Sequence, residues 1–302
     1  MISKLTRFYR TSSNIIKFLL KVISVIPFGM LYSISSVVYV ILYYVIRYRR
    51  NTVFNNLQES FPDKSKKKIK RIEKRFYHYF ADNIVEICKM WSMSDDEMRG
   101  HIKFINVDDI NEKLRKGKSV ALYLGHYANW EWISSLPLNI DKNIICGQIY
   151  HKLSNPDIDR IMQENRTWNG SVNIEMRETA RHINRLSMEN KVYIIGFIAD
   201  QSPRKKDARH YIPFLNHEIP VQIATEKIIR HYEMDAWFVR PKRIKRGFYE
   251  AEFIHMDDTT TKDRNFGLTE TYFRLLEETI HQNPEFYLWT HRRFRLSKRI
   301  LS

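Results

Sequence analysis

The sequence is poor in cysteine, glycine and proline, and each shortage excludes a class of protein. Its 302 residues include two cysteines, Cys88 and Cys146, too few for a disulfide-stabilised scaffold. They form no metal-binding or redox motif, so we interpret them as reduced core residues in a reducing compartment. Nine glycines and nine prolines are few for this length, which argues against a loop-rich or low-complexity chain. The length suits one large domain with an appendage.

Acidic side chains are also scarce relative to basic ones. Lysine and arginine total 50 against 34 aspartates and glutamates, which gives a net charge of +16. Such an excess implies an anionic partner, which can be nucleic acid, anionic lipid or an acidic protein. Part of it lies at residues 64–75, KSKKKIKRIEKR, where an amphipathic helical pattern begins. Either an ordinary solvated helix face or contact with anionic headgroups explains this run.

Charged residues are missing altogether between residues 22 and 46. As a single helix this segment would extend about 37 Å, enough to cross the hydrocarbon core of a bilayer. A core helix of a soluble protein is the alternative, and Pro27 and Gly29 also allow a break into a re-entrant hairpin. Basic residues flank both ends, so the charge-bias rule gives no orientation. We predict a membrane-embedded segment and leave spanning and monotopic insertion open.

An alternation of strand-like and helical patterns follows residue 100. Strand-like runs lie at 119–124, 143–149, 192–198, 236–240 and 249–254, and helical patterns at 155–168, 176–189, 221–233 and 268–282. Near-continuous apolar strands separated by helices predict an α/β fold with a mostly parallel sheet covered by helices on both faces.

The most informative stretch is residues 119–132, SVALYLGHYANWEW. The apolar run ends at Gly125, and His126 and Glu131 follow it among aromatic residues. In open α/β sheets the chemistry lies at the carboxyl ends of strands, which is where His126 falls. Residues five apart point about 140° apart on a regular helix, so the two side chains meet only if His126 lies in the turn before a helix. A carboxylate on one ring nitrogen would make the other a better base.

By itself this histidine–glutamate spacing is also compatible with a chance pair. A metal site is not expected, because no third ligand is spaced nearby and the HExxH motif is absent. No Gly-x-Ser-x-Gly elbow occurs, so the sequence offers no nucleophile for an acyl-enzyme.

Five motifs can be read along the chain, and they are RRNTVFNNLQESFP (49–62), GHYANWEW (125–132), RTWNG (166–170), ADQSP (199–203) and PEFYLWTHRRFR (284–295). With these motifs the chain resembles the bacterial lipid A biosynthesis acyltransferases of the lauroyl/myristoyl type over nearly its whole length. The resemblance implies a glycerol-3-phosphate acyltransferase-type sandwich on the cytoplasmic face of the bacterial inner membrane. Residues 1–50 are then a membrane-anchoring segment and residues 51–302 the acyltransferase catalytic domain. The acyl donor is expected to be acyl carrier protein and the acceptor a lipid A precursor.

The resemblance also implies roles for individual residues. His126 is the general base and Glu131 its orienting partner, in a direct attack of a substrate hydroxyl on a thioester without any cofactor. Arg166 holds a substrate phosphate, with a structural salt bridge as the alternative. Asp200 and Gln201 follow the strand-like run at 192–198, at the same topological position as His126, and are expected to bind substrate or organise the loop.

One departure from the family pattern concerns the acceptor. Residues 214–216, Phe-Leu-Asn, stand where many members have an FFG-like segment, as in Bacteroidetes relatives. A pigment, an ornithine lipid or another glycolipid is therefore an alternative acceptor. A membrane-tethered nucleic-acid-binding protein is the alternative from another class. No nucleic-acid-binding module is recognisable, so we expect anionic membrane lipids and acyl carrier protein, not nucleic acid, as partners.

Overall fold

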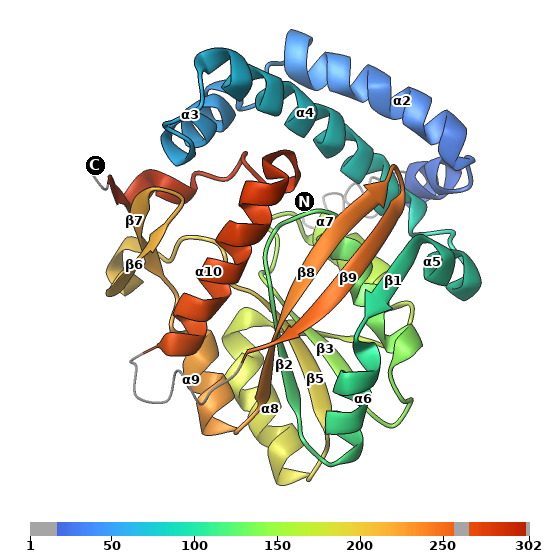
Figure 1. Cartoon of the computed structure of the whole chain (residues 1–302). Coiled ribbons are helices and arrows are strands. Elements are labelled where there is room, and N and C mark those ends of the chain that lie inside the picture. The colour runs from blue at the N-terminus through green and yellow to red at the C-terminus, as the bar shows by residue number, and fades with distance from the viewer. Residues whose placement is uncertain (1–16, 257–265, 300–302) are drawn as a thin grey trace, which may run out of the picture.

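A mostly parallel seven-stranded sheet forms the centre of the protein in the computed structural model, which describes residues 17–256 and 266–299 (Figure 1). In spatial order its strands are β1 (Ile102–Ile105), β9 (Phe248–His255), β8 (Asp235–Lys245), β2 (Val120–Leu124), β5 (Tyr193–Ile198), β3 (Ile145–Tyr150) and β4 (Val172–Glu175). Neighbouring strands are parallel except β8 and β9, which form an antiparallel hairpin. The predicted α/β class is confirmed, while the closer likeness to a glycerol-3-phosphate acyltransferase sandwich stays a prediction.

Helices cover this sheet, and a small antiparallel sheet lies beside it. The small sheet contains β10 (Lys298–Arg299), β7 (His217–Val221) and β6 (His210–Phe214). The helices are α2 (Phe28–Val40), α3 (Arg50–Ser60), α4 (Lys66–Lys89), α5 (Asp95–His101), α6 (Val107–Arg115), α7 (Pro156–Thr167), α8 (Thr179–Met188), α9 (Ala224–His231) and α10 (Gly267–Gln282). The strands predicted at 119–124, 143–149 and 192–198 are confirmed to within two residues at either end.

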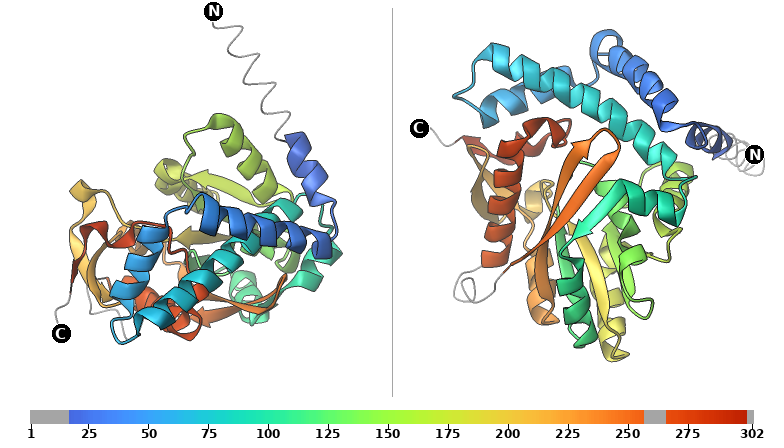
Figure 2. Two further views of the ribbon diagram at one scale, coloured as in Figure 1. Left: turned by 90° about the horizontal axis from the view of Figure 1, so that it is seen from above. Right: turned by 45° about the vertical axis from the view of Figure 1, so that its right-hand side comes forward.

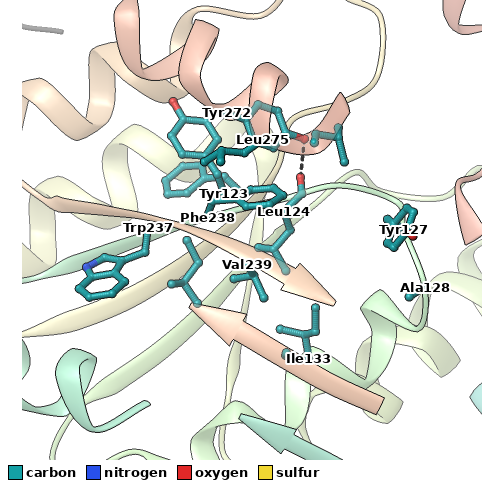
Figure 3. Packing of buried hydrophobic residues seen from close by; sticks show 14 of the residues in the cluster. Tyr123, Leu124, Tyr127, Ala128, Ile133, Trp237, Phe238, Val239, Tyr272 and Leu275 are labelled. Atoms are coloured by element: carbon teal, nitrogen blue, oxygen red, sulfur yellow. Dashed lines mark hydrogen bonds between the residues drawn. The ribbon is translucent and has the colours of Figure 1, made fainter. Parts of the chain in front are cut away.

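Strand β2 is buried along its whole length and lies in the middle of the sheet. On one face, the ring of Tyr123 stacks on Tyr272 of α10 with centroids 4.9 Å apart (Figure 3). The Tyr272 hydroxyl donates a hydrogen bond to the backbone carbonyl of Leu124 (2.7 Å). The same carbonyl also accepts from the backbone N–H of Ala199 (3.2 Å), so two hydrogen bonds hold the end of the strand from which the chain continues to His126.

Helix α4 contains the basic run and has the predicted amphipathic form. Its N-cap is Ser65, whose side chain accepts from the backbone N–H of Lys68 (3.4 Å). Ile69 and Phe76 are fully buried against the domain. The basic side chains lie on the opposite, exposed face, and they are Lys66, Lys67, Lys68, Lys70, Arg71, Lys74 and Arg75.

The charge-free segment is not one continuous helix. Residues 17–24 are helical, the chain turns at residues 25–27, and α2 then begins at Phe28. Pro27 stands at the break, where its missing N–H and fixed φ favour the first turn of a new helix. Helix α2 continues as a π-helix (Ile41–Val45), so the helical stretch from Phe28 to Val45 is long and apolar enough to cross a membrane. The boundary predicted at residue 50 stays a prediction.

Candidate active site

His126 lies just beyond the carboxyl end of β2, in a loop that the C-terminal motif holds in place. The backbone carbonyl of His126 accepts from the N–H of Leu288 (3.0 Å), and the N–H of Ala128 donates to the carbonyl of Phe286 (2.9 Å). Two motifs that are far apart in the sequence therefore form one wall of the site. This contact explains why the PEFYLWTHRRFR segment accompanies the GHYANWEW segment.

Asp200 is the carboxylate that binds His126. It follows β5, the parallel neighbour of β2, so the two residues meet at the same edge of the sheet. Nδ1 of His126 lies 2.6 Å from Oδ1 of Asp200, and the backbone N–H of His126 donates to Oδ2 (3.2 Å). The carboxylate fixes the tautomer with its hydrogen on Nδ1 and leaves Nε2 as the acceptor. Nε2 lies 3.3 Å from the side-chain nitrogen of Gln201.

The two partners shift each other's protonation in opposite directions. Burial alone would lower the pKa of His126, but the neighbouring Asp200 carboxylate outweighs it, and the pKa is raised above its ordinary value. Burial alone would raise the pKa of Asp200, but the imidazole beside it outweighs this effect, and the pKa is lowered. Asp200 therefore stays ionised, and His126 is a stronger base than a free histidine.

Glu131 pairs with Arg166 in the structure and not with His126, which corrects the predicted pair. It lies in the first turn of a 3₁₀-helix (Trp130–Asn139) and His126 precedes that helix, as expected. Its side chain turns instead toward α7, where Nη2 and Nε of Arg166 donate to its two oxygens at 2.6 and 2.8 Å. The planar guanidinium offers a permanent charge and two matched donors, which an imidazole does not.

The salt bridge considered as the alternative for Arg166 is thus present. Burial would raise the pKa of Glu131, but the guanidinium outweighs it, and the pKa is lowered. The Glu131 carboxylate also contributes through space to the raised pKa of His126. The Arg166 side chain keeps 22% of its surface exposed and lines the cavity described below, so an anionic ligand there can still reach it.

A cavity of about 1000 Å³ opens in front of His126. Its polar end contains His126, Glu131, Arg166 and Gln201. Its apolar part lies between the sheet and the 3₁₀-helix and is lined by Leu122, Leu124, Ile133, Leu136, Cys146 and Ile194. The space is therefore polar where the base lies and apolar farther down the strands.

Gly196 keeps the floor of this apolar part open. It lies on β5 in register with Leu122 of β2 and lines the cavity. A Cβ atom built on Gly196 would lie 3.2 Å from Cδ1 of Leu124, a tight contact with another cavity-lining side chain. A larger residue here would occupy space that the cavity now has.

A buried carboxylate on α4 supports the segment that follows His126, and the sequence analysis missed it. Glu86 accepts hydrogen bonds from Asn129 (3.0 Å), the Tyr249 hydroxyl (2.6 Å) and the Tyr32 hydroxyl (3.0 Å). Asn129 in turn accepts from the backbone N–H of Trp132 (3.3 Å). Burial raises the pKa of Glu86 to about 7. An acidic residue inside an apolar helical pattern was the available signal.

The departure from the family pattern at residues 214–216 is a hairpin turn. Phe214 ends β6, His217 begins β7, and the two residues between them have positive φ angles of 48° (Leu215) and 62° (Asn216). Two positive φ angles are typical of the tight turns that fit twisted strands, and asparagine tolerates this conformation well. Neither Leu215 nor Asn216 lines the cavity, so the departure affects a turn and not the cavity wall.

The comparison with known proteins identifies a family. The sequence model of a family described as "Bacterial lipid A biosynthesis acyltransferase" matches residues 4–296. No curated protein matches the sequence. The match covers nearly the whole chain, including both walls of the cavity, and the family implies an acyl donor and a lipid acceptor. This chain is therefore an acyltransferase and belongs to the bacterial lipid A biosynthesis acyltransferase family.

Proposed function

We propose that this enzyme moves a fatty acyl chain from the thioester of acyl carrier protein onto a hydroxyl of a lipid A precursor. His126 acts as the general base, and Asp200, in place of Glu131, orients its imidazole. The observation that carries this proposal is the 2.6 Å contact between Nδ1 of His126 and Oδ1 of Asp200, at the polar end of a cavity whose other part is apolar. The reaction uses the side chains of this chain and needs no cofactor.

The transfer proceeds in one addition and one elimination. The acceptor hydroxyl attacks the thioester carbon while Nε2 of His126 takes its proton, and the Asp200 carboxylate stabilises the imidazolium. The tetrahedral intermediate then expels the carrier thiolate, which receives the proton back from His126. An oxygen ester forms, a thioester breaks, and His126 returns to its neutral state.

Gln201 and Arg166 stabilise negative charge in this scheme. The side-chain amide of Gln201 lies 3.3 Å from Nε2 of His126, so it is near the carbonyl oxygen of a thioester that reacts there. The guanidinium of Arg166 lines the same cavity and binds a phosphate of the acceptor. Glu131 holds that guanidinium in place through two hydrogen bonds and acts on the reaction through it.

The apolar part of the cavity is the proposed site of the acyl chain. Its side chains come from β2, β5, β3 and the 3₁₀-helix, and they offer apolar surface to a hydrocarbon tail. Trp130 stands beside the imidazole with ring centroids 5.2 Å apart and also lines the cavity. The tail thus extends from the reacting carbon at His126 down toward Leu122 and Gly196.

Basic residues near the cavity fit the expected partners. Four exposed cations follow the Asp200 loop, and they are Arg204, Lys205, Lys206 and Arg209, of which Arg204 lines the cavity. Such a surface attracts an acidic carrier protein and the phosphates of a lipid acceptor. The exposed cations of α4 suit the anionic headgroups of the inner membrane. We place the catalytic domain on the cytoplasmic side, where carrier-bound acyl chains are made.

The direct test is acyl transfer in vitro with the full-length chain. A labelled acyl carrier protein thioester and a lipid A precursor are incubated with wild-type protein and with His126→Ala. A general base is worth about 10²–10⁴ in rate, so the variant should lose at least that much. His231→Ala, an exposed histidine at the end of α9, is the matched control and should keep its activity. A folded His126→Ala enzyme with near-normal turnover contradicts the proposal.

The acceptor is tested separately. Mass spectrometry of lipid A from cells that lack this protein should show loss of one acyl chain. An unchanged lipid A with an altered pigment, ornithine lipid or other glycolipid would keep the mechanism and replace the acceptor.

A further inference from the structure

The helical stretch from Phe28 to Val45 has two faces of different chemistry. Its outward face is a row of exposed apolar side chains, and these are Met30, Ile34, Val37, Val40, Ile41 and Val45. Val45 is 72% exposed and Val37 is 59% exposed, which is unusual for aliphatic residues of a soluble domain. The outward face is thus mostly apolar and has no cover within the described residues.

The outward face contains polar atoms, but they are already hydrogen-bonded inside the helix. The hydroxyl of Ser33 donates to the carbonyl of Gly29 (3.3 Å), and the hydroxyl of Ser36 donates to the carbonyl of Tyr32 (2.9 Å). Serines that bond back to the preceding turn need no water. This face can therefore enter hydrocarbon without leaving these donors unpaired.

The inward face is polar and bound to the catalytic domain. The Tyr32 hydroxyl donates to Glu86 (3.0 Å), and the Ser35 hydroxyl donates to Asp82 (2.5 Å), both on α4. Asp82 also binds the guanidinium groups of two arginines from the β8–β9 hairpin, Arg243 and Arg246, at 2.7 and 2.5 Å. The helix thus covers the buried Asp82 carboxylate and takes part in its hydrogen bonding.

Further contacts hold the same helix along its length. The ring of Tyr39 stacks on His78 with centroids 3.5 Å apart, and Tyr43 packs edge to face on Tyr77. Phe28 lies against Trp132, which belongs to the segment that follows His126. Figures 1 and 2 accordingly show α2 running beside α4 on the outer side of the domain.

A helix that crossed the bilayer would have to leave this position. The hydroxyls of Tyr32 and Ser35 would then enter hydrocarbon without their partners, and the buried Asp82 carboxylate would lose its cover. Its two ends would also lie on opposite sides of the membrane, although exposed cations flank both, Lys21 before it and Arg47 after it. Both ends suit the same anionic surface.

We propose that the stretch Phe28–Val45 lies along the membrane surface and does not span it. Its outward row enters one leaflet of a bilayer with anionic headgroups, and its inward face stays docked on α4. The catalytic domain and both ends of the helix then lie on one side of the membrane. This inference rests on the membrane association included in the proposed function and specifies its geometry.

The experiment measures the depth of single labels in the full-length protein. Nitroxides are attached at Met30→Cys, Val37→Cys and Val45→Cys, in a background where Cys88 and Cys146 are replaced by alanine. The protein is bound to phosphatidylethanolamine–phosphatidylglycerol vesicles. Collision with oxygen, which concentrates in hydrocarbon, is compared with collision with a water-soluble nickel complex. A label at Met188→Cys on α8, which is 77% exposed in the structure, is the control for a site outside the membrane.

We expect the three helix labels to share one shallow depth and the Met188 label to stay in water. A label at Val37 near the bilayer centre, with the Met30 and Val45 labels at opposite surfaces, overturns the proposal in favour of a spanning helix. Labels shielded from both reagents together with a concentration-dependent dimer overturn it in favour of a second copy of the chain. A protein that does not bind vesicles at all overturns the membrane association itself, while acyl transfer from carrier protein can still be measured in detergent.

A topological measurement gives an independent answer. A protease-cleavable tag is placed at the amino terminus, and inverted inner-membrane vesicles expose the cytoplasmic side. The surface geometry places the tag and the catalytic domain on the same side, so the protease should remove both. A tag that is protected until the vesicles are opened, while the domain is cleaved, contradicts it.

Discussion

Two buried carboxylates lie close to His126, and their partners separate their roles. Asp200 binds the imidazole of His126, a group that can gain and lose a proton near neutral pH. Glu131 binds the guanidinium of Arg166, which stays charged at every accessible pH. A carboxylate with a titratable partner can tune a proton transfer, and a carboxylate with a permanent cation can only hold charge and position. The Asp200 and Glu131 carboxylates should therefore respond differently when each is replaced by its amide.

The strongest difference is expected when each acid becomes its amide. Asp200→Asn should lower kcat by about 10²–10⁴, because the proposed role of Asp200 is in the proton transfer. Its free energy of unfolding should change less than that of Glu131→Gln. Neutral His126 is the active form, so kcat/KM rises with pH through the pKa of His126. Asp200 raises that pKa, so in Asp200→Asn the acidic limb should move to lower pH. Kinetics from pH 5 to 9 measure both effects.

A double variant tests whether the two residues act together. His126→Ala combined with Asp200→Asn should be no slower than His126→Ala alone, because Asp200 acts through the imidazole. Additive losses would give Asp200 a separate role. An unmoved acidic limb in Asp200→Asn would contradict its effect on the base.

Glu131→Gln should have the reverse profile, with a larger effect on stability than on turnover. It leaves a partly buried guanidinium beside a neutral amide, which costs about 1–3 kcal/mol of unfolding free energy. Turnover should fall less than in Asp200→Asn. Urea unfolding and steady-state kinetics on the same preparations compare the two. Replacing Arg166 by Gln as well should restore part of the stability, because no unpaired charge remains.

Arg166→Lys tests the proposed contact between Arg166 and a phosphate of the acceptor. Lysine keeps the charge but loses the forked donors, so KM for the acceptor should rise more than KM for the acyl donor. An equal rise in both values would assign Arg166 to the salt bridge alone.

The smallest change in rate is expected from Gly196→Val, which leaves both pairs intact. The added methyl groups occupy the floor of the apolar cavity beside Leu124. The preferred acyl chain should therefore become shorter while the pH profile stays that of the wild type. Competition between carrier-bound acyl chains of different length measures the preference. A preserved chain-length profile would place the tail elsewhere.

Much of the fold can be predicted from the sequence, because its long elements have strong patterns. The buried strand β2 is an uninterrupted apolar run, and α4 and α10 have clear helical periodicity. The short strands β1, β4, β6, β7 and β10 are missed, since two to five residues without a continuous apolar run give too little pattern to separate a strand from a loop.

Which candidate residues lie at this edge of the sheet could be predicted better than which of their side chains pair. His126 and Asp200 both follow predicted strands, and the neighbouring parallel arrangement of those strands brings them together. Glu131 is closer to His126 in the sequence, but a side-chain direction depends on what else is within reach. Arg166, which comes 35 residues later in the sequence, binds both oxygens of Glu131. Such a competition between partners cannot be seen from local spacing.

The shape of the cavity has a consequence for inhibition. The proposed base, the guanidinium proposed to bind phosphate and the apolar floor border one continuous space of about 1000 Å³. A single molecule that joins a hydrocarbon tail to a phosphate through an unreactive linker meets both parts at once. It would compete with donor and acceptor together, and the linker length that binds best would measure how far apart the two substrates lie when they react.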